Sequence, residues 1–235
     1  MKAVILAAGK GTRIPEITKD IPKCLIEVQG KTILERQLAM LLKNSFKKIY
    51  VVIGYKAEIV QKKISYNSKI EFILNKDYAT TDNIYSLFLT RDKIKEESFL
   101  LLNGDILCEE KIIKKLVENE SVDIAPVDTK HYDSEKLKIK VENDRVLGIL
   151  PKNTPNYMSD GSTIGIFKFS TDGSKILFDE IEKCIKSGEK NRWFEFALTR
   201  ICKQIDMQVL DIHGMKWVEI DDLMDLKKAQ KIFGG

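Results

Sequence analysis

Residues 2–27 read KAVILAAGKGTRIPEITKDIPKCLIEV, and the fold and function that we expect both follow from this stretch. Its apolar opening has the length of a buried strand, and a glycine-rich run at residues 9–13 follows directly. Glycines let backbone N–H groups approach an anion closely, and Lys10 and Arg13 add positive charge. Another cation, Lys23, follows further along the chain. We therefore expect a loop that contacts a polyphosphate from two sides.

Two better-known phosphate loops do not fit this run. A dinucleotide-binding GxGxxG loop needs a third glycine where Ile14 stands, and Pro15 follows it. A Walker A loop ends in Gly-Lys-Ser/Thr, which residues 11–13 do not supply. The missing glycine also argues against an oxidoreductase that binds nicotinamide or flavin. Because the glycine pair alone would equally suit an ordinary turn, the interpretation depends on the cation downstream.

Composition is typical of a soluble globular protein, with 43% hydrophobic and 31% charged residues. The net charge of +4 comes from 39 basic and 35 acidic residues that are interleaved, which favours solvated helix faces over a nucleic-acid surface. No apolar run approaches the roughly 20 residues that cross a bilayer. We expect no nucleic acid and no membrane among the partners. A monomer and a homodimer both remain open.

The cysteines give no sign of a metal centre or a disulfide framework. They are scattered, without a CxxC pair, and only His131 and His213 accompany them, so no zinc site is expected. Reduced, mainly buried thiols in a cytoplasmic protein are the expectation. The four are Cys24, Cys108, Cys184 and Cys202.

Strands and helices alternate in the first half of the chain. We expect strands at residues 3–8, 48–54, 70–74, 99–102 and 122–127, and helices at residues 32–44, 57–65, 83–95 and 109–119. This order predicts an α/β fold with a mostly parallel, Rossmann-like sheet and helices on both faces. Ligands of such sheets bind beyond the carboxyl ends of the strands, so the glycine loop and Asn103-Gly104-Asp105 should converge.

The second half is richer in β-structure. We expect a hairpin of residues 138–141 and 145–150, strands at residues 162–169, 208–212 and 217–220, and helices at residues 175–186, 194–203 and 223–232. No linker separates the halves. We expect one domain over residues 1–235, in which residues 1–130 bind nucleotide and residues 131–235 form a small β-rich acceptor-side subregion.

Two predicted strands end in aspartate. Asp105 follows residues 99–102, and Asp221 and Asp222 follow Trp217-Val218-Glu219-Ile220. Asp222 can cap the last helix, which leaves Asp221 free to face a ligand. Two aspartates at two strand ends suit Mg²⁺, which prefers oxygen ligands and often bridges carboxylates to phosphates.

These segments together resemble one enzyme family. AAGKGTR at residues 7–13 and PKCLIEVQGKTILERQL at residues 22–38 are similar to the opening signature of the nucleotidyltransferases that make sugar nucleotides and CDP-activated alcohols. NGDI at 103–106 and WVEIDDLMDL at 217–226 resemble that family's metal-binding motifs. The resemblance implies that Asp105 and Asp221 bind Mg²⁺. It also implies that Arg13 holds the triphosphate and Lys23, on an exposed loop, contacts the reacting phosphate.

Within that family, residues 54–60 (GYKAEIV) and 78–87 (YATTDNIYSL) look most like the phosphocholine cytidylyltransferase branch, although Asp82 replaces an asparagine. The resemblance implies CTP, and a small phosphorylated acceptor, phosphoglutamine ahead of phosphocholine, in capsule or cell-surface polysaccharide modification. A sugar-1-phosphate enzyme using UTP or dTTP, or a non-catalytic nucleotide-binding module, are the alternatives. The implied nucleotide-binding residues are Leu6, Ala7, Ala8, Gly9, Lys10, Gly11, Thr12, Arg13, Lys23, Tyr55, Thr80, Asn83, Gly104 and Asp105. Candidates for the acceptor pocket are Lys138, Asp160, Ser162, Arg192, Trp193 and Glu195.

Overall fold

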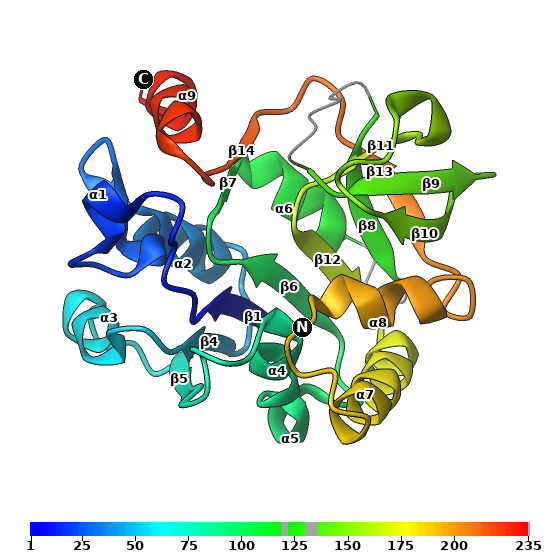
Figure 1. Cartoon of the computed structure of the whole chain (residues 1–235), viewed down its shortest axis with the longest axis horizontal. Coiled ribbons are helices and arrows are strands. Elements are labelled where there is room, and N and C mark those ends of the chain that lie inside the picture. Colours follow the sequence, from blue (N-terminus) through cyan, green and yellow to red (C-terminus); the bar gives the residue numbers. More distant parts are fainter. Residues whose placement is uncertain (119–121, 130–135, 235) are drawn as a thin grey trace.

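A computed structural model describes residues 1–118, 122–129 and 136–234. The predicted helix end at Asn119, the predicted boundary at residues 130 and 131, and His131 fall outside these residues. In the described part of the chain, ten strands form one mixed sheet in the order β11-β9-β10-β13-β8-β12-β6-β1-β4-β5. Figure 1 shows the sheet running across the molecule, with α9 beside the C-terminus. The predicted α/β class is confirmed.

The N-terminal half supplies the parallel part of the sheet. β1 pairs in parallel with β4 on one side and β6 on the other, and β4 pairs in parallel with β5. Their residues alternate between the two faces, because successive side chains of a strand point in opposite directions. The bounds are β1 (Lys2–Ala7), β4 (Ile49–Ile53), β5 (Ile70–Leu74) and β6 (Phe99–Asn103).

The C-terminal half extends the sheet mostly with antiparallel pairs, so the sheet is mixed rather than parallel throughout. The expected hairpin is present as β9 and β10, and it turns through Asn143 and Asp144, which both have positive φ. The bounds are β8 (Ile124–Asp128), β9 (Lys138–Glu142), β10 (Arg145–Leu150), β11 (Gly161–Thr163), β12 (Ile166–Phe169) and β13 (Gln208–Asp211). Two short pairs lie outside this sheet, β2 (Glu27–Val28) with β3 (Lys31–Thr32), and β7 (Ile106–Cys108) with β14 (Trp217–Glu219).

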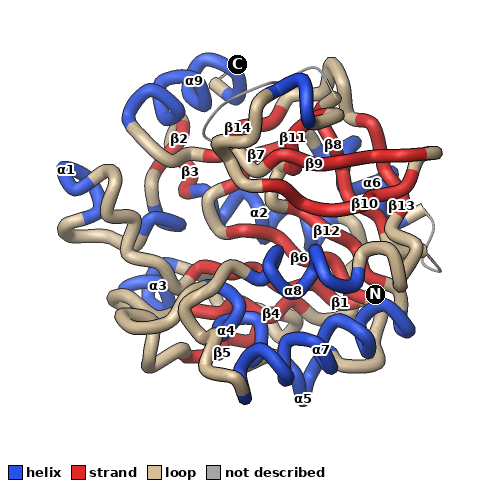
Figure 2. The backbone as a smooth tube through the Cα atoms, turned by 45° about the vertical axis from the view of Figure 1, so that its right-hand side comes forward, coloured by secondary structure: helices blue, strands red, loops and turns tan. Residues whose placement is uncertain are grey.

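Helices cover both faces of the sheet, as the alternating pattern predicted (Figure 2). One face packs against α2 (Ile33–Lys43), α3 (Ala57–Lys63) and α6 (Glu110–Val117). The other packs against α4 (Asn83–Phe88), α5 (Arg91–Ile94), α7 (Thr171–Lys186) and α8 (Phe194–Ile201). A third, smaller core lies under α9 (Leu223–Phe233). The remaining short helices are α1 (Pro15–Thr18), η1 (Lys23–Leu25) and η2 (Asn156–Met158).

Two expected elements are interrupted. The predicted helix 83–95 is divided into α4 and α5, where the Thr90 hydroxyl donates to the Leu87 carbonyl at 2.7 Å and competes with the helical pattern. The predicted strand 162–169 breaks at Gly165, whose φ of +69° suits glycine. A Cβ at Gly165 would lie 2.8 Å from Asn103 Nδ2, so glycine there lets the strand pass close to the end of β6.

Candidate active site

The glycine loop and the Asp105 loop meet at the carboxyl ends of β1 and β6, as expected from the sequence. Leu6 on β1 is in register with Asn103 on β6, and Gly104 N donates to the Leu6 carbonyl at 2.9 Å. A Cβ at Gly104 would lie 2.7 Å from that same oxygen. Glycine at this position therefore allows the two loops to touch.

Asp221 reaches the same place from the C-terminal part of the chain. β14 pairs antiparallel with β7, and Ile220 N donates to the Asp105 carbonyl at 3.0 Å. The Asp222 side chain accepts from the backbone N–H groups of Met224 and Asp225 and caps α9, as predicted. Asp221 instead turns inward, and its side chain is only 3% exposed.

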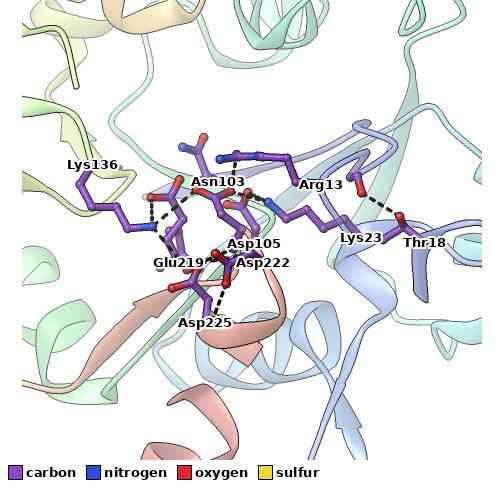
Figure 3. Close-up of polar contacts among 12 residues, drawn as sticks. Arg13, Thr18, Lys23, Asn103, Asp105, Lys136, Glu219, Asp222 and Asp225 are labelled. Carbon is purple, nitrogen blue, oxygen red and sulfur yellow. Dashed lines mark hydrogen bonds and ion pairs between the residues drawn. The ribbon is translucent and has the colours of Figure 1, made fainter. Parts of the chain in front are cut away.

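Six charged side chains form one network between these loops, and Figure 3 labels all of them except Asp221. Lys23 Nζ lies 2.6 Å from Asp105 Oδ2 and 2.9 Å from Asp221 Oδ1, and Arg13 donates to the same Asp221 oxygen. On the opposite side, Lys136 Nζ lies 2.8 Å from Glu219 Oε2. We call this group the charged cluster; its members are Arg13, Lys23, Lys136, Asp105, Glu219 and Asp221.

Burial and charge set the ionisation of the cluster. Burial alone would raise the pKa of Asp221, but Lys23, Lys136 and Arg13 hold it at about 2. Burial would lower the pKa of Lys23, yet Asp105 and Asp221 raise it above its usual value. The pKa of Glu219 is raised by burial and by the neighbouring aspartates, against the effect of Lys136. Lys23 and Asp221 are therefore both charged at neutral pH.

Lys23 is more enclosed than the sequence suggested. Its side chain is 13% exposed, so the expectation of an exposed loop lysine is wrong. Gly11 contributes to this enclosure: its φ is +73°, and a Cβ there would lie 2.9 Å from the Lys23 Cβ. The glycine loop thus packs directly on the stem of Lys23, while Asp105 and Asp221 accept from its ammonium.

An open cleft lies in front of the cluster. It is lined by many residues that the sequence nominated: Leu6, Ala7, Ala8, Gly9, Arg13, Lys23, Asn83, Gly104, Asp105, Trp193 and Glu195. Cys24 also lines it, but burial raises the pKa of this thiol to about 12, so a thiolate nucleophile is not available at neutral pH. Cys24, Cys108, Cys184 and Cys202 are all free.

Other nominated residues lie outside the cleft lining. The Tyr55 hydroxyl donates to the Lys19 carbonyl at 2.8 Å, and Lys10 lies over the Tyr55 ring. Lys138 and Ser162 are fully buried, and Asp160 accepts from Val141 N. The nominated residues outside the lining are Lys10, Gly11, Thr12, Tyr55, Thr80, Lys138, Asp160, Ser162, Arg192 and Asp221. Asp221 lies just behind the lining, where it forms an ion pair with the lining residue Lys23.

The sequence reasoning missed several residues that the fold brings to the site. Glu219 lies two residues before Asp221, so both acids fall on one face of the extended chain, and this spacing was a usable signal. Lys136 and Lys152 carried no such signal, since each is one lysine among many. Lys152 lines the cleft, and its Nζ lies 5.4 Å from the centre of the Trp193 ring.

An acidic and aromatic wall closes the far side of the cleft. It forms where the start of α4 meets the start of α8, because Asp82 N donates to the Lys190 carbonyl and Phe194 N donates to Asn83 Oδ1. Glu195 is 5% exposed, and its Oε2 is buried without a hydrogen-bond partner in the part of the chain that the structure describes. Burial raises the pKa of Glu195 to about 8.

We expect Glu195→Gln to reverse part of a pH-dependent loss of stability. A carboxyl group whose pKa is raised on folding binds more protons when folded, so stability falls as pH rises from about 4.5 to 8. Glutamine cannot ionise, so the variant avoids this loss. The Tm of the variant minus the Tm of the parent should therefore be several degrees higher at pH 9 than at pH 5. Thermal unfolding at both pH values measures this. An equal Tm difference at the two pH values would contradict the assignment.

The fold and the site together define a class: an α/β protein with a glycine-rich, cationic loop and clustered carboxylates at the ends of parallel strands. Residues 2–231 match the Nucleotidyl transferase family, and the chain belongs to it. No helix among the described residues is long and apolar enough to span a membrane.

Among three similar proteins, two have names that mention CTP. The chain is 28% identical over 231 residues to the bifunctional IPC transferase and DIPP synthase of Aquifex aeolicus, covering 97% of this chain but 51% of that protein. It thus spans about half the length of this relative. It is 28% identical over 254 residues to the CTP:phosphoglutamine cytidylyltransferase of Campylobacter jejuni, covering 97% of this chain and 98% of that protein. The inositol-1-phosphate CTP transferase of T. maritima shares the fold, with a TM-score of 0.78 at 23% identity, over 100% of this chain and 96% of that one.

Proposed function

We propose that this chain is a Mg²⁺-dependent cytidylyltransferase that transfers CMP from CTP to a small phosphorylated acceptor and releases pyrophosphate. The observation that carries the proposal is the meeting of Lys23, Asp105 and Asp221 beside the cleft, within a chain of the Nucleotidyl transferase family. Residues 1–235 would act as one domain, with the nucleotide on the β1 side and the acceptor toward α8.

The carboxylates fit a magnesium ion. One oxygen from each of Asp105, Glu219 and Asp221 lies within 4.8 Å of the others, and the set offers only hard oxygen ligands. Asp105 Oδ1 is buried and makes no hydrogen bond among the described residues, as expected of an oxygen kept for a ligand. Mg²⁺ held there would neutralise phosphate charge.

The reaction needs positioning more than proton transfer. The acceptor phosphate is already ionised near neutral pH, so it attacks the α-phosphorus of CTP without a general base, and pyrophosphate leaves. Arg13 is 53% exposed at the mouth of the cleft, where its guanidinium can bind the phosphates of the nucleotide. Lys23 lies deeper, where its positive charge would stabilise the negative charge that develops on the oxygens of the reacting phosphate.

Cytosine is the base we favour. The support is the resemblance of residues 54–60 and 78–87 to the cytidylyltransferase branch, and similarity along nearly the whole length of a CTP:phosphoglutamine cytidylyltransferase. The base would lie beside the end of β1, where Ala8 and Asn75 line the cleft.

The acceptor should carry a nitrogen beyond its phosphate. Trp193 is 44% exposed and faces the cleft together with Glu195 and Asp82, so this wall combines an aromatic surface with two carboxyl groups. Burial raises the pKa of both carboxyl groups, and a positive charge bound beside them would favour their ionised forms. Such a surface suits an ammonium group. Lys152 beside it provides a charge for an acceptor anion. Phosphoglutamine fits this mixture best, followed by phosphocholine, and the product would serve capsule or cell-surface polysaccharide modification.

A pyrophosphate-release assay tests the proposal directly. CTP, UTP, dTTP and ATP are each combined with phosphoglutamine, phosphocholine, phosphoethanolamine and glucose 1-phosphate. We expect turnover with CTP and a nitrogen-bearing acceptor, with a steep preference, because an acceptor that leaves Glu195 unpaired in a buried wall binds poorly.

Two results would contradict the assignment. Strong turnover of UTP or dTTP with glucose 1-phosphate, and none with CTP, would place the chain in the sugar branch. Binding of CTP without pyrophosphate release from any acceptor would indicate a non-catalytic nucleotide-binding module.

A further inference from the structure

Gln37 is a polar residue inside an apolar helix face. It lies on α2 among the buried residues Leu34, Leu38 and Leu41, and it is 1% exposed. A buried amide without hydrogen bonds costs on the order of a few kcal/mol, so a glutamine at this position requires a partner.

The partners are the two carbonyls that flank Asp105. Gln37 Nε2 donates to the Asn103 carbonyl at 2.8 Å and to the Ile106 carbonyl at 2.9 Å. Both neighbours accept only, so the NH₂ side of the amide must face them. We call residues 103–106 the Asp105 turn. One side chain thus holds both ends of the Asp105 turn.

The remaining sides of this turn are fixed by backbone. Asn103 N donates to the Gly165 carbonyl, Gly104 N to the Leu6 carbonyl, and the Asp105 carbonyl accepts from Ile220 N. These contacts come from strands and loops on the cleft side. Gln37 adds hydrogen bonds from the helix behind the turn, where Ile106 also packs against the leucines of α2.

The same helix also supports Lys23. Cys24 and Leu25, next to Lys23 on η1, pack in one core with Leu34 and Leu38 of α2. The start of α2 is fixed by a capping box between Thr32 and Glu35. α2 therefore lies behind both Lys23 and the Asp105 turn.

We infer that Gln37 is a positioning residue, which holds the Asp105 turn so that the Asp105 carboxylate keeps its distance from Asp221 and Lys23. This inference rests on the proposed role of Asp105 as a ligand of Mg²⁺. The Gln37 Oε1 is buried without a hydrogen-bond partner among the described residues. A methionine or leucine would avoid that cost, so a glutamine that only filled space would be a poor choice.

Gln37→Met tests the inference, because methionine matches the length of glutamine but donates no hydrogen bond. Gln37→Leu serves as a second variant if methionine does not fold. Leu41→Val, one turn further along the same buried face, is the control for general loosening of α2. Pyrophosphate release is measured against Mg²⁺ concentration at saturating CTP and acceptor. Hydrogen–deuterium exchange of peptides that cover residues 103–106 and 220 is followed in the protein alone.

Gln37→Met should raise the Mg²⁺ concentration for half-maximal rate by about 10-fold or more, the scale for residues that support a metal ligand. Exchange at residues 103–106 and 220 should become faster, while Leu41→Val keeps the parent values for both. If the parent depends on Mg²⁺ and Gln37→Met retains the same dependence and exchange, the inference is overturned and the proposed function is not. If the parent needs no divalent ion, the proposed function fails. The inference about Gln37 is then tested by hydrogen–deuterium exchange alone, and equal exchange in Gln37→Met and the parent overturns it.

Discussion

Asp221→Asn should lower kcat by at least about 100-fold, the scale for losing one group that stabilises charge in a transition state. Asp221 is nearly fully buried, is held ionised by three cations, and shares the cluster with Asp105. Asparagine keeps the shape of the side chain but removes the charge that Mg²⁺ requires. Steady-state pyrophosphate release over a range of Mg²⁺ concentrations measures the loss.

Asp222→Asn is the matched control for this variant. The Asp222 side chain accepts hydrogen bonds from the backbone N–H groups at the start of α9, and asparagine caps helices about as well as aspartate. Its activity and Tm should therefore stay close to those of the parent. An active Asp221→Asn protein beside an inactive Asp222→Asn protein would overturn the choice between the adjacent acids.

Asp105→Asn should be as inactive as Asp221→Asn, and the double variant should be little worse than either. Both carboxylates would act through one ion, so their effects are not additive. Additive losses in a folded double variant would show that the two residues do not share an ion.

The strand ends were predictable because they depend on local pattern. Short apolar runs that lead into a glycine or an aspartate predicted β1 and β6. Because the two strands are parallel neighbours, their carboxyl ends lie together. The role of Asp222 followed from its position before α9, since capping is local chemistry. Glu219 could have been found from its spacing to Asp221.

The acceptor side was less predictable because it depends on tertiary contacts. Lys138 and Ser162 are paired across β9 and β11 and are fully buried, a register that no local pattern announces. Trp193 and Glu195 face the cleft because the starts of α4 and α8 are joined by hydrogen bonds between segments over 100 residues apart. Lys136 reaches Glu219 through the same kind of long-range contact.

Lys23→Ala should lower turnover by about 100-fold or more, because one charged donor at the reacting phosphate contributes a few kcal/mol to the barrier. Lys228→Ala is the control and should keep normal turnover, because Lys228 is an exposed lysine on α9 that does not line the cleft. Single-turnover measurements at saturating CTP separate the chemical step from binding. Near-normal turnover in a folded Lys23→Ala protein would refute the assignment.

The enclosed position of Lys23 adds a second effect to this variant, and a double variant separates the two. Lys23→Ala removes a cation from the buried Asp221, so we expect stability to fall by about 1–3 kcal/mol. Adding Asp221→Asn removes the buried carboxylate that has lost one of its three cations, so the double variant should recover part of the lost Tm. It should stay inactive, because Asp221→Asn alone is expected to be inactive, so this variant measures the effect on stability and the single-turnover rates of Lys23→Ala measure the effect on chemistry. A double variant no more stable than Lys23→Ala would contradict the stabilising effect of the Lys23–Asp221 pair.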